Sequence, residues 1–207
     1  NEVGVLLADD AIEHADTGGK AKLVVTTVVS SSLLSRMARD RGVACRETLT
    51  GFKWIVDAAL RGEREGLAFV FGYEEALGYS LGTLVRDKDG IGAALHLAGL
   101  ARFLKRYGRT LLDRLDDLLV AHGLCHQVQW SVVLPGAEGR ARIDAAMAEL
   151  RKTSPRRIGT SPVVRVLDAQ ESLDACREAG IPEDRIMTGR GPFSVEELPA
   201  RFAVKTE

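Results

Sequence analysis

The chain has 207 residues, a formal net charge of -1 and a hydrophobic fraction of 45%, enough for one large domain or two modest ones. The near-zero net charge gives no sign of nucleic acid or a charged membrane as partner, and no apolar run approaches the ~18 residues of a membrane span. Three dispersed cysteines do not suggest a disulfide framework and favour a reducing cytoplasm. The start, Asn1-Glu2-Val3-Gly4, shows no signal-peptide pattern, and we expect a piece of a longer protein.

Helical and strand-like patterns alternate over the first 121 residues. In chain order we predict a helix over 1–16, a strand over 22–29, a helix from the capping serines 30–32 to Arg41, a strand over 43–48, a helix over 51–62 and a strand over 67–71. Residues 79–86 are expected to add an antiparallel edge strand, followed by helices over 89–107 and 109–121. The βαβαβ order with short links predicts a mostly parallel sheet covered by helices.

The pattern changes after Gly123. We predict a strand over 125–134, a turn at Pro135-Gly136, a helix over 139–152 and a strand over 163–167, with little periodicity from Gly180 onward. The predicted fold is therefore α/β: a three-layer α/β/α domain over 1–122 with a mixed, mostly parallel sheet. A linker and a partial α+β domain are expected over 123–207. Trp54 and Trp130 are predicted to pack in cores.

Polar segments follow two of the predicted strands. Thr50-Gly51-Phe52-Lys53 comes after 43–48, and Gly72-Tyr73-Glu74-Glu75-Ala76 comes after 67–71. Because ligands gather at the carboxyl ends of parallel strands, both segments are expected to converge on one ligand. Because successive side chains of an extended segment point to opposite sides, we expect only one of Glu74 and Glu75 to face the ligand. The segment Arg86-Asp87-Lys88-Asp89-Gly90 follows. Carboxylates that bind hydroxyl groups, close to cations that bind phosphate, are the groups that a sugar-phosphate site needs.

Each segment also has a purely structural interpretation. The first can be a turn that starts a helix, the glutamates can be a solvated strand end paired with Arg86 or Lys88, and Asp89 can cap the next helix. His122, Cys125 and His126 match no standard zinc spacing, and the calcium-loop pattern is incomplete, so no metal site is predicted within the chain.

Taken together, Thr50-Gly51-Phe52-Lys53, Glu74-Glu75-Ala76-Leu77-Gly78 and Arg86-Asp87-Lys88-Asp89-Gly90 resemble the third domain of the α-D-phosphohexomutase superfamily, the phosphoglucomutases and phosphomannomutases. The resemblance covers roughly 1–121, and 123–207 look like the run into the fourth domain. It implies that a phosphoserine donates its phosphoryl group to a sugar monophosphate, and that the bisphosphate formed returns the other phosphate, assisted by Mg²⁺. The third domain reads the sugar.

The resemblance also implies roles for individual residues. Glu74 would accept hydrogen bonds from sugar hydroxyls, and Lys88 would be catalytic, stabilising phosphoryl charge near the reacting hydroxyl. The remaining substrate-binding residues would be Thr50, Gly51, Lys53, Ala76, Gly78 and Arg86. Ala76 stands where most of the family has a serine. The form Glu-Glu-Ala-x-Gly-Tyr is closer to the branch with phosphopentomutases and glucose-1,6-bisphosphate synthases.

The sequence lacks the family's Ser-His-Asn-Pro phosphoserine segment, its Asp-Gly-Asp-x-Asp-Arg metal loop and its Arg-x-Ser-Gly-Thr-x-Pro phosphate loop. We therefore expect a mutase fragment that is inactive alone, with Mg²⁺ ligands outside this chain. Its partners would be the phosphosugar and the remaining domains of the enzyme. The sequence leaves open whether the chain forms a homo-oligomer. One rival is a non-enzymatic sugar-phosphate-binding or assembly module that docks through the basic face of 140–165. Another is an independent enzyme with Glu74 as general base and Lys88 as electrophile.

Overall fold

The computed structural model describes residues 1–125, 131–163 and 166. They belong to two units, 1–127 and 128–207, which are described separately. Among the described residues, no helix combines the length and the apolar character needed to cross a membrane.

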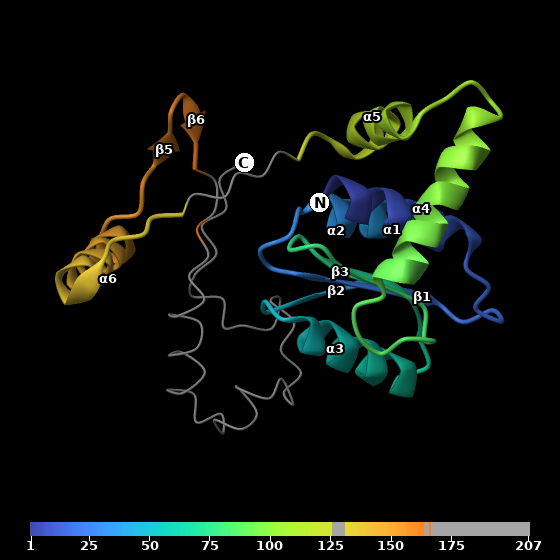
Figure 1. The fold of residues 1–207 in the computed structure, drawn as a ribbon, viewed down its shortest axis with the longest axis horizontal. Coiled ribbons are helices and arrows are strands. Elements are labelled where there is room, and N and C mark those ends of the chain that lie inside the picture. The colour runs from blue at the N-terminus through green and yellow to red at the C-terminus, as the bar shows by residue number, and fades with distance from the viewer. Residues whose placement is uncertain (126–130, 164–165, 167–207) are drawn as a thin grey trace. The chain divides into compact units, whose positions relative to one another are not determined.

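The first unit contains a four-stranded sheet and five helices within its described residues (Figure 1). Its elements are α1 (Glu2–His14), β1 (Lys22–Thr27), α2 (Leu33–Asp40), β2 (Ala44–Thr48), α3 (Phe52–Arg64), β3 (Ala68–Glu74), β4 (Gly78–Leu81), α4 (Gly90–Lys105) and α5 (Leu111–His122). The strand order is β2-β1-β3-β4, with β1 parallel to β2 and β3, and β4 antiparallel to β3. The predicted α/β class with a mixed, mostly parallel sheet is confirmed.

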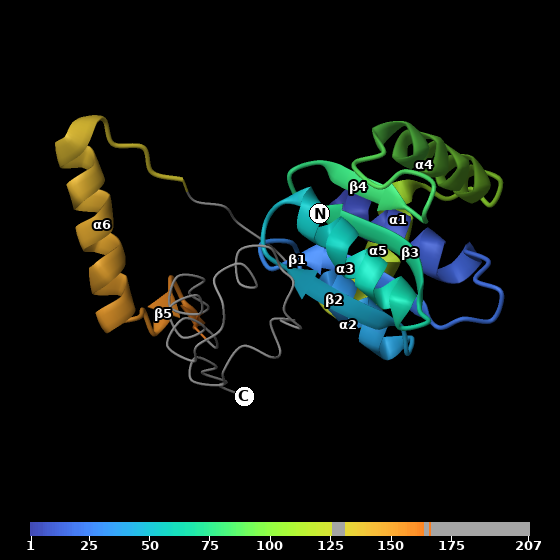
Figure 2. The same cartoon turned by 90° about the horizontal axis from the view of Figure 1, so that it is seen from below.

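The helices cover both faces of this sheet (Figures 1 and 2). α3 packs on one face, and α1 and α2 pack on the other. α5 lies against α1 and α2 on the side away from the sheet, while α4 contacts β4 and α1. Because both faces are covered, the central strands β1 and β3 are buried along nearly their whole length.

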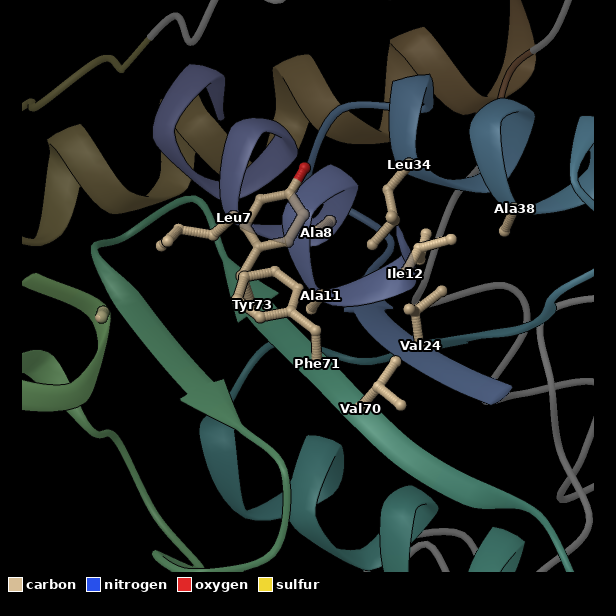
Figure 3. Close-up of a cluster of buried hydrophobic side chains, with 11 residues drawn as sticks. Leu7, Ala8, Ala11, Ile12, Val24, Leu34, Ala38, Val70, Phe71 and Tyr73 are labelled. Carbon is tan, nitrogen blue, oxygen red and sulfur yellow. The ribbon is translucent and has the colours of Figure 1, made fainter. Parts of the chain in front are cut away.

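Side chains of the central strands alternate between two hydrophobic cores. Leu23 and Val25 of β1 pack against α3, whereas Val24 packs against α1 and α2. In β3 the pairing shifts, since Leu23 pairs with Phe69 and Val24 pairs with Phe71, which leaves Val70 as a bulge. The bulge is why the consecutive residues Val70 and Phe71 both belong to the core on the α1 side (Figure 3).

Two helices of the first unit, α4 and α5, begin at a side-chain cap. The Asp89 carboxylate accepts the Gly92 N–H at 2.8 Å, so Asp89 caps α4 as the structural interpretation of this segment predicts. Thr110 and Asp113 form a reciprocal capping box that starts α5. Among the serines predicted as caps, Ser32 is the N-cap of α2 but makes no side-chain capping hydrogen bond, while Ser31 Oγ accepts the N–H of Leu33 at 3.2 Å.

In the second unit, the described residues form α6 (Gly136–Lys152) and an antiparallel pair, β5 (Arg157–Ile158) and β6 (Ser161–Pro162). The helix predicted over 139–152 is confirmed. It begins three residues earlier, so the turn predicted at Pro135-Gly136 is wrong. Gly136 is the first residue of α6, directly after the N-cap Pro135, and it takes the positive φ of 71° that glycine tolerates.

The two strands predicted in this region are also wrong where the structure describes them. Cys125 and residues 131–134 lie in no strand, and 126–130 lie outside the described residues. β-branched residues favour a strand only when they pack, and Val133 is 89% exposed. Val163 and Val166 are not in strands either, while 164–165 and 167–207 lie outside the described residues.

Candidate functional site

Three loops meet at the carboxyl ends of the parallel strands. They are the β1 loop (28–32), the β2 loop (49–51) and the β3–β4 turn (75–77). Since β1 lies between β2 and β3 in the sheet, the β1 loop is placed between the other two. Reasoning from the sequence named residues of the outer two loops only. It interpreted the three serines of the middle loop as helix caps, because no His and Asp partner pattern accompanies them.

The Glu74 carboxylate lies at this edge, at the end of β3. Its side chain is only 7% exposed, and Lys88 Nζ lies 3.2 Å from Oε1. The same ammonium lies 5.1 Å from the centre of the Phe52 ring, at the start of α3. A Cβ on Gly78 would come within 2.8 Å of Glu74 Cγ and 2.9 Å of the Phe52 ring, so only glycine fits there. Glu74, Gly78 and Lys88, all predicted site residues, are therefore brought together. Sequence reasoning did not single out Phe52.

The β3–β4 turn is anchored to the β1 loop. Ser30 Oγ accepts the N–H of Glu75 at 3.2 Å and lies 2.8 Å from Thr27 Oγ1. Ala76 and Leu77 are exposed at the tip of the turn. Leu77 has φ 62°, the left-handed conformation that costs a residue with a Cβ roughly 1–2 kcal/mol. The turn therefore holds local strain beside the glutamates.

The first turn of α3 borders the same edge. Gly51 is its N-cap, with φ 122° and no capping side chain, so the first N–H groups of the helix can bind an anion. Thr50 and Lys53 are exposed, and Lys53 Nζ lies 4.7 Å from the centre of the Trp54 ring. The expectation that Trp54 packs in a core is wrong: its side chain is half-buried and belongs to none of the hydrophobic core clusters.

Arg86 is not brought to these loops. Its guanidinium makes two 2.8 Å hydrogen bonds to Glu63, near the end of α3. Both residues line a cavity of about 650 Å³ beside the start of β3, together with Asp10, His14, Phe69 and His96. The segment from Arg86 to Lys88 thus crosses from one edge of the sheet towards the other, and Lys88 alone of the two cations reaches Glu74.

The raised pKa of the Tyr73 hydroxyl excludes this side chain as a general base near pH 7. Its ring is fully buried in the α1-side core (Figure 3), and burial raises the pKa of its hydroxyl, which donates to Asn1 Oδ1 at 3.2 Å. Burial also raises the pKa of Tyr79. Both phenols stay neutral near pH 7 and so cannot act as bases there.

The described residues contain no cluster of three or more His, Cys, Asp or Glu side chains that could hold a metal ion. His122 Nδ1 lies 2.6 Å from Asp40 instead, and Cys125 Sγ lies 3.5 Å from Ser32 Oγ. These residues therefore do not fit the Mg²⁺ that the resemblance implies.

Similarity to known proteins shows the family to which this chain belongs. Residues 1–121 match the model of the phosphoglucomutase/phosphomannomutase family for its alpha/beta/alpha domain III. The chain belongs to this family. It is 32% identical over 158 residues to a phosphoglucomutase of Staphylococcus aureus (strain USA300), and 33% identical over 168 residues to one of Staphylococcus haemolyticus. These alignments include 76% and 81% of this chain.

This phosphoglucomutase/phosphomannomutase-family chain spans only part of its relatives' length. The two alignments cover 28% and 30% of the staphylococcal proteins. Among solved structures, the Paramecium phosphoglucomutase pp63/parafusin matches 59% of this chain and 20% of its own chain, with 20% identity and a TM-score of 0.46.

Proposed function

We propose that this chain supplies the sugar-binding domain of a phosphoglucomutase/phosphomannomutase-type phosphosugar mutase. The mutase would move a phosphoryl group within a sugar through a phosphoserine and a sugar bisphosphate. Residues 1–122 would be the third domain, and 123–207 would be a linker and part of the fourth. The chain by itself would bind the sugar phosphate and would not turn it over, because effective catalysis needs all reacting groups held together.

The pairing of Glu74 with Lys88 carries this proposal. A carboxylate can accept several hydrogen bonds, so Glu74 Oε1 can hold Lys88 while the group still accepts from sugar hydroxyls. Lys88 is half exposed and can contact a ligand phosphate or a reacting hydroxyl from the same position. Lys53 and the uncapped first turn of α3 add positive potential at this edge for a phosphate.

In this proposal the ligands of the metal ion are not residues of this chain. Mg²⁺ would assist phosphoryl transfer by neutralising charge, and its ligands would come from other domains of the enzyme. The contributions of this chain are to bind the sugar through Glu74 and Gly78, and to hold a positive charge at Lys88.

A nearby branch of the family is the second candidate. Ala76 and Tyr79 give the turn the form Glu-Glu-Ala-x-Gly-Tyr, which favours a phosphopentomutase or glucose-1,6-bisphosphate synthase as the whole enzyme. A non-enzymatic binding module is a further alternative. It predicts sugar-phosphate binding by the chain without turnover by the complete enzyme.

The cellular setting is inferred from the thiols. Among the described residues, Cys45 and Cys125 form no disulfide bond, and the three dispersed cysteines of the sequence favour a reducing cytoplasm. The partners would be the phosphosugar and the other domains of the enzyme. A homo-oligomer would be detected by light scattering.

Titration of the 207-residue chain tests the binding role. We would add glucose-1-phosphate, mannose-1-phosphate and ribose-1-phosphate, follow amide NMR shifts, and assay phosphosugar turnover in the same sample. We expect sugar-dependent shifts in 50–53 and 72–88 and no turnover. Glu74→Gln should remove the sugar dependence, while the exposed Glu138→Gln in α6 should leave it unchanged. Turnover by the chain, or shifts that Glu74→Gln leaves unchanged, would contradict the proposal.

A further inference from the structure

Phe52 is the first residue of α3, and its side chain is buried although the helix begins at the edge of the site. It is 3% exposed and belongs to the hydrophobic core beneath α3, together with Leu23, Val25 and Ile55. The next residue, Lys53, is exposed. The Phe52 ring thus brings this core to the carboxyl edge of the sheet.

The ring of Phe52 also contacts the groups proposed to bind the sugar phosphate. Lys88 Nζ lies 5.1 Å from the ring centre, within the ~6 Å at which a cation is attracted to the face of an aromatic ring. A Cβ added to Gly78 would lie 2.9 Å from Phe52 Cδ2 and 3.0 Å from Glu74 Oε1, so the ring packs beside the glutamate as well. The Lys88 ammonium is therefore held by two groups, the Glu74 carboxylate and the Phe52 ring.

A second contact matters for Lys88 because its side chain is flexible and 48% exposed. Hydrogen bonds already fix its backbone: the N–H of Lys88 donates to Asp87 Oδ1 at 2.7 Å, and the N–H of Asp89 donates to the Tyr79 carbonyl at 2.7 Å. What remains to be ordered is the long side chain of Lys88. A ring that is itself locked in a packed core can provide that order.

Lys53 and Trp54 form another cation–ring pair at this edge, with Nζ 4.7 Å from the ring centre. These two residues are adjacent in the chain, so their contact joins no separate segments. The contact of Phe52 with Lys88 instead joins the start of α3 to the segment that leads into α4. It therefore fixes one cation of the site relative to the helix end proposed to bind phosphate.

We propose that Phe52 is a positioning residue, whose ring holds the Lys88 ammonium at Glu74, where it meets the phosphate or the reacting hydroxyl of the sugar phosphate. This inference rests on the proposed function of the site. Phe52 would act through Lys88 and not through the ligand, since its side chain is almost wholly buried. An aliphatic side chain at this position would fill the core without attracting the ammonium, so the role requires an aromatic ring.

NMR of the 207-residue chain tests the position of Lys88. Protons above an aromatic ring are shifted upfield by the ring current, so the ε-CH₂ protons of Lys88 should lie upfield of those of Lys152, the exposed last residue of α6. Phe52→Leu should remove this shift, whereas the shift of Lys53 over Trp54 should remain. The Lys53 shift also reports that the first turn of α3 is folded in the variant.

Binding of glucose-1-phosphate, measured by NMR titration, tests the consequence of this position. Phe52→Leu should weaken binding about two- to fivefold, the effect of a cation–ring contact at an exposed site, and should have no further effect in a chain with Lys88→Met. Phe69→Leu is the matched control: it removes a ring from the same core and should leave Kd and the Lys88 shift unchanged. Phe52→trifluorophenylalanine keeps the core filled but weakens the negative charge on the ring face, so it should also weaken binding.

Three results would overturn the role of Phe52 and leave the proposed function standing. The first is an absence of the upfield shift of Lys88 in the parent chain. The second is a Kd that both Phe52 variants leave unchanged while Lys88→Met weakens binding, and the third is equal weakening by Phe52→Leu with and without Lys88. Failure of the parent chain to bind any sugar phosphate would overturn the proposed function and this role with it.

Discussion

Arg114 in α5 donates two hydrogen bonds, of 2.8 and 2.9 Å, to the carboxylate of Asp9 in α1. Arg41, directly after α2, donates a third at 2.6 Å. The hydrogen bond to Asp9 also raises the pKa of Arg114. One buried carboxylate thus joins three helices on the same side of the sheet.

Asp9→Asn should lower the free energy of unfolding by about 3 kcal/mol, because two partly buried arginines lose their countercharge. Asp116→Asn, exposed on α5, removes the same charge and should change stability by less than about 0.5 kcal/mol. Urea denaturation followed by circular dichroism compares the two variants. Equal effects would show that Asp9 does not join the helices.

Lys88→Met leaves the buried Glu74 carboxylate without its cation while keeping an apolar contact with Phe52. We expect a loss of about 1 kcal/mol, reduced by the half exposure of Lys88. A double-mutant cycle with Glu74→Gln should give a coupling energy of about 1 kcal/mol. The same cycle with Lys105→Met at the end of α4 should give additive effects, and a coupling near zero for Lys88 would contradict the ion pair.

Gly4→Ala should destabilise the first unit. Its Cβ would lie 2.6 Å from Cδ2 of the fully buried Tyr73 ring, and that ring has no room to move. Overpacking of this kind costs about 1–3 kcal/mol. Gly99→Ala is the matched control in α4, where a Cβ meets nothing within 4 Å, and it should stabilise the chain by up to about 1 kcal/mol. Thermal unfolding should therefore shift in opposite directions.

Leu77→Gly should stabilise the chain. Without a Cβ the left-handed conformation no longer costs the folded state about 1–2 kcal/mol. The greater conformational freedom of glycine in the unfolded chain lowers this gain by about 0.5–1 kcal/mol. Ala76→Gly, at the adjacent position with ordinary φ, should instead destabilise by about 0.5–1 kcal/mol. A lower urea midpoint for Leu77→Gly would mean that Leu77 makes a stabilising contact despite its 78% exposure.

Acid should weaken α5 through Asp113. Hydrogen bonds from the backbone and side chain of Thr110 hold the pKa of Asp113 below its ordinary value of 3.8. Because the folded pKa is the lower one, this stabilisation is present above the unfolded pKa and is lost as the pH falls through the folded pKa. The urea midpoint of the parent should therefore fall from about pH 5 downwards, and Asp113→Asn should show a shallower fall. Identical pH profiles would exclude a role for the capping box.

The elements of the first unit could be predicted from local patterns. The β-branched run of β1 forms a strand because both faces of that strand are covered, and Gly42 and Gly108 stop helices where the chain needs a positive φ. The same reasoning failed for 131–134, where a similar run includes the exposed Val133. Local propensity yields a strand only where partners bury it.

By itself, the sequence determined the order of elements in the first unit, the resemblance to the mutase family, and the candidates Glu74, Gly78 and Lys88. Only the tertiary structure decided that β1 is central, that Arg86 binds Glu63 instead of Glu74, and that one carboxyl oxygen of Glu75 is buried without a hydrogen bond to the described residues. The physical reason is that capping, turns and periodicity act between residues close in the chain. Strand order, ion-pair choice and the burial of a single oxygen depend on how distant segments pack against each other.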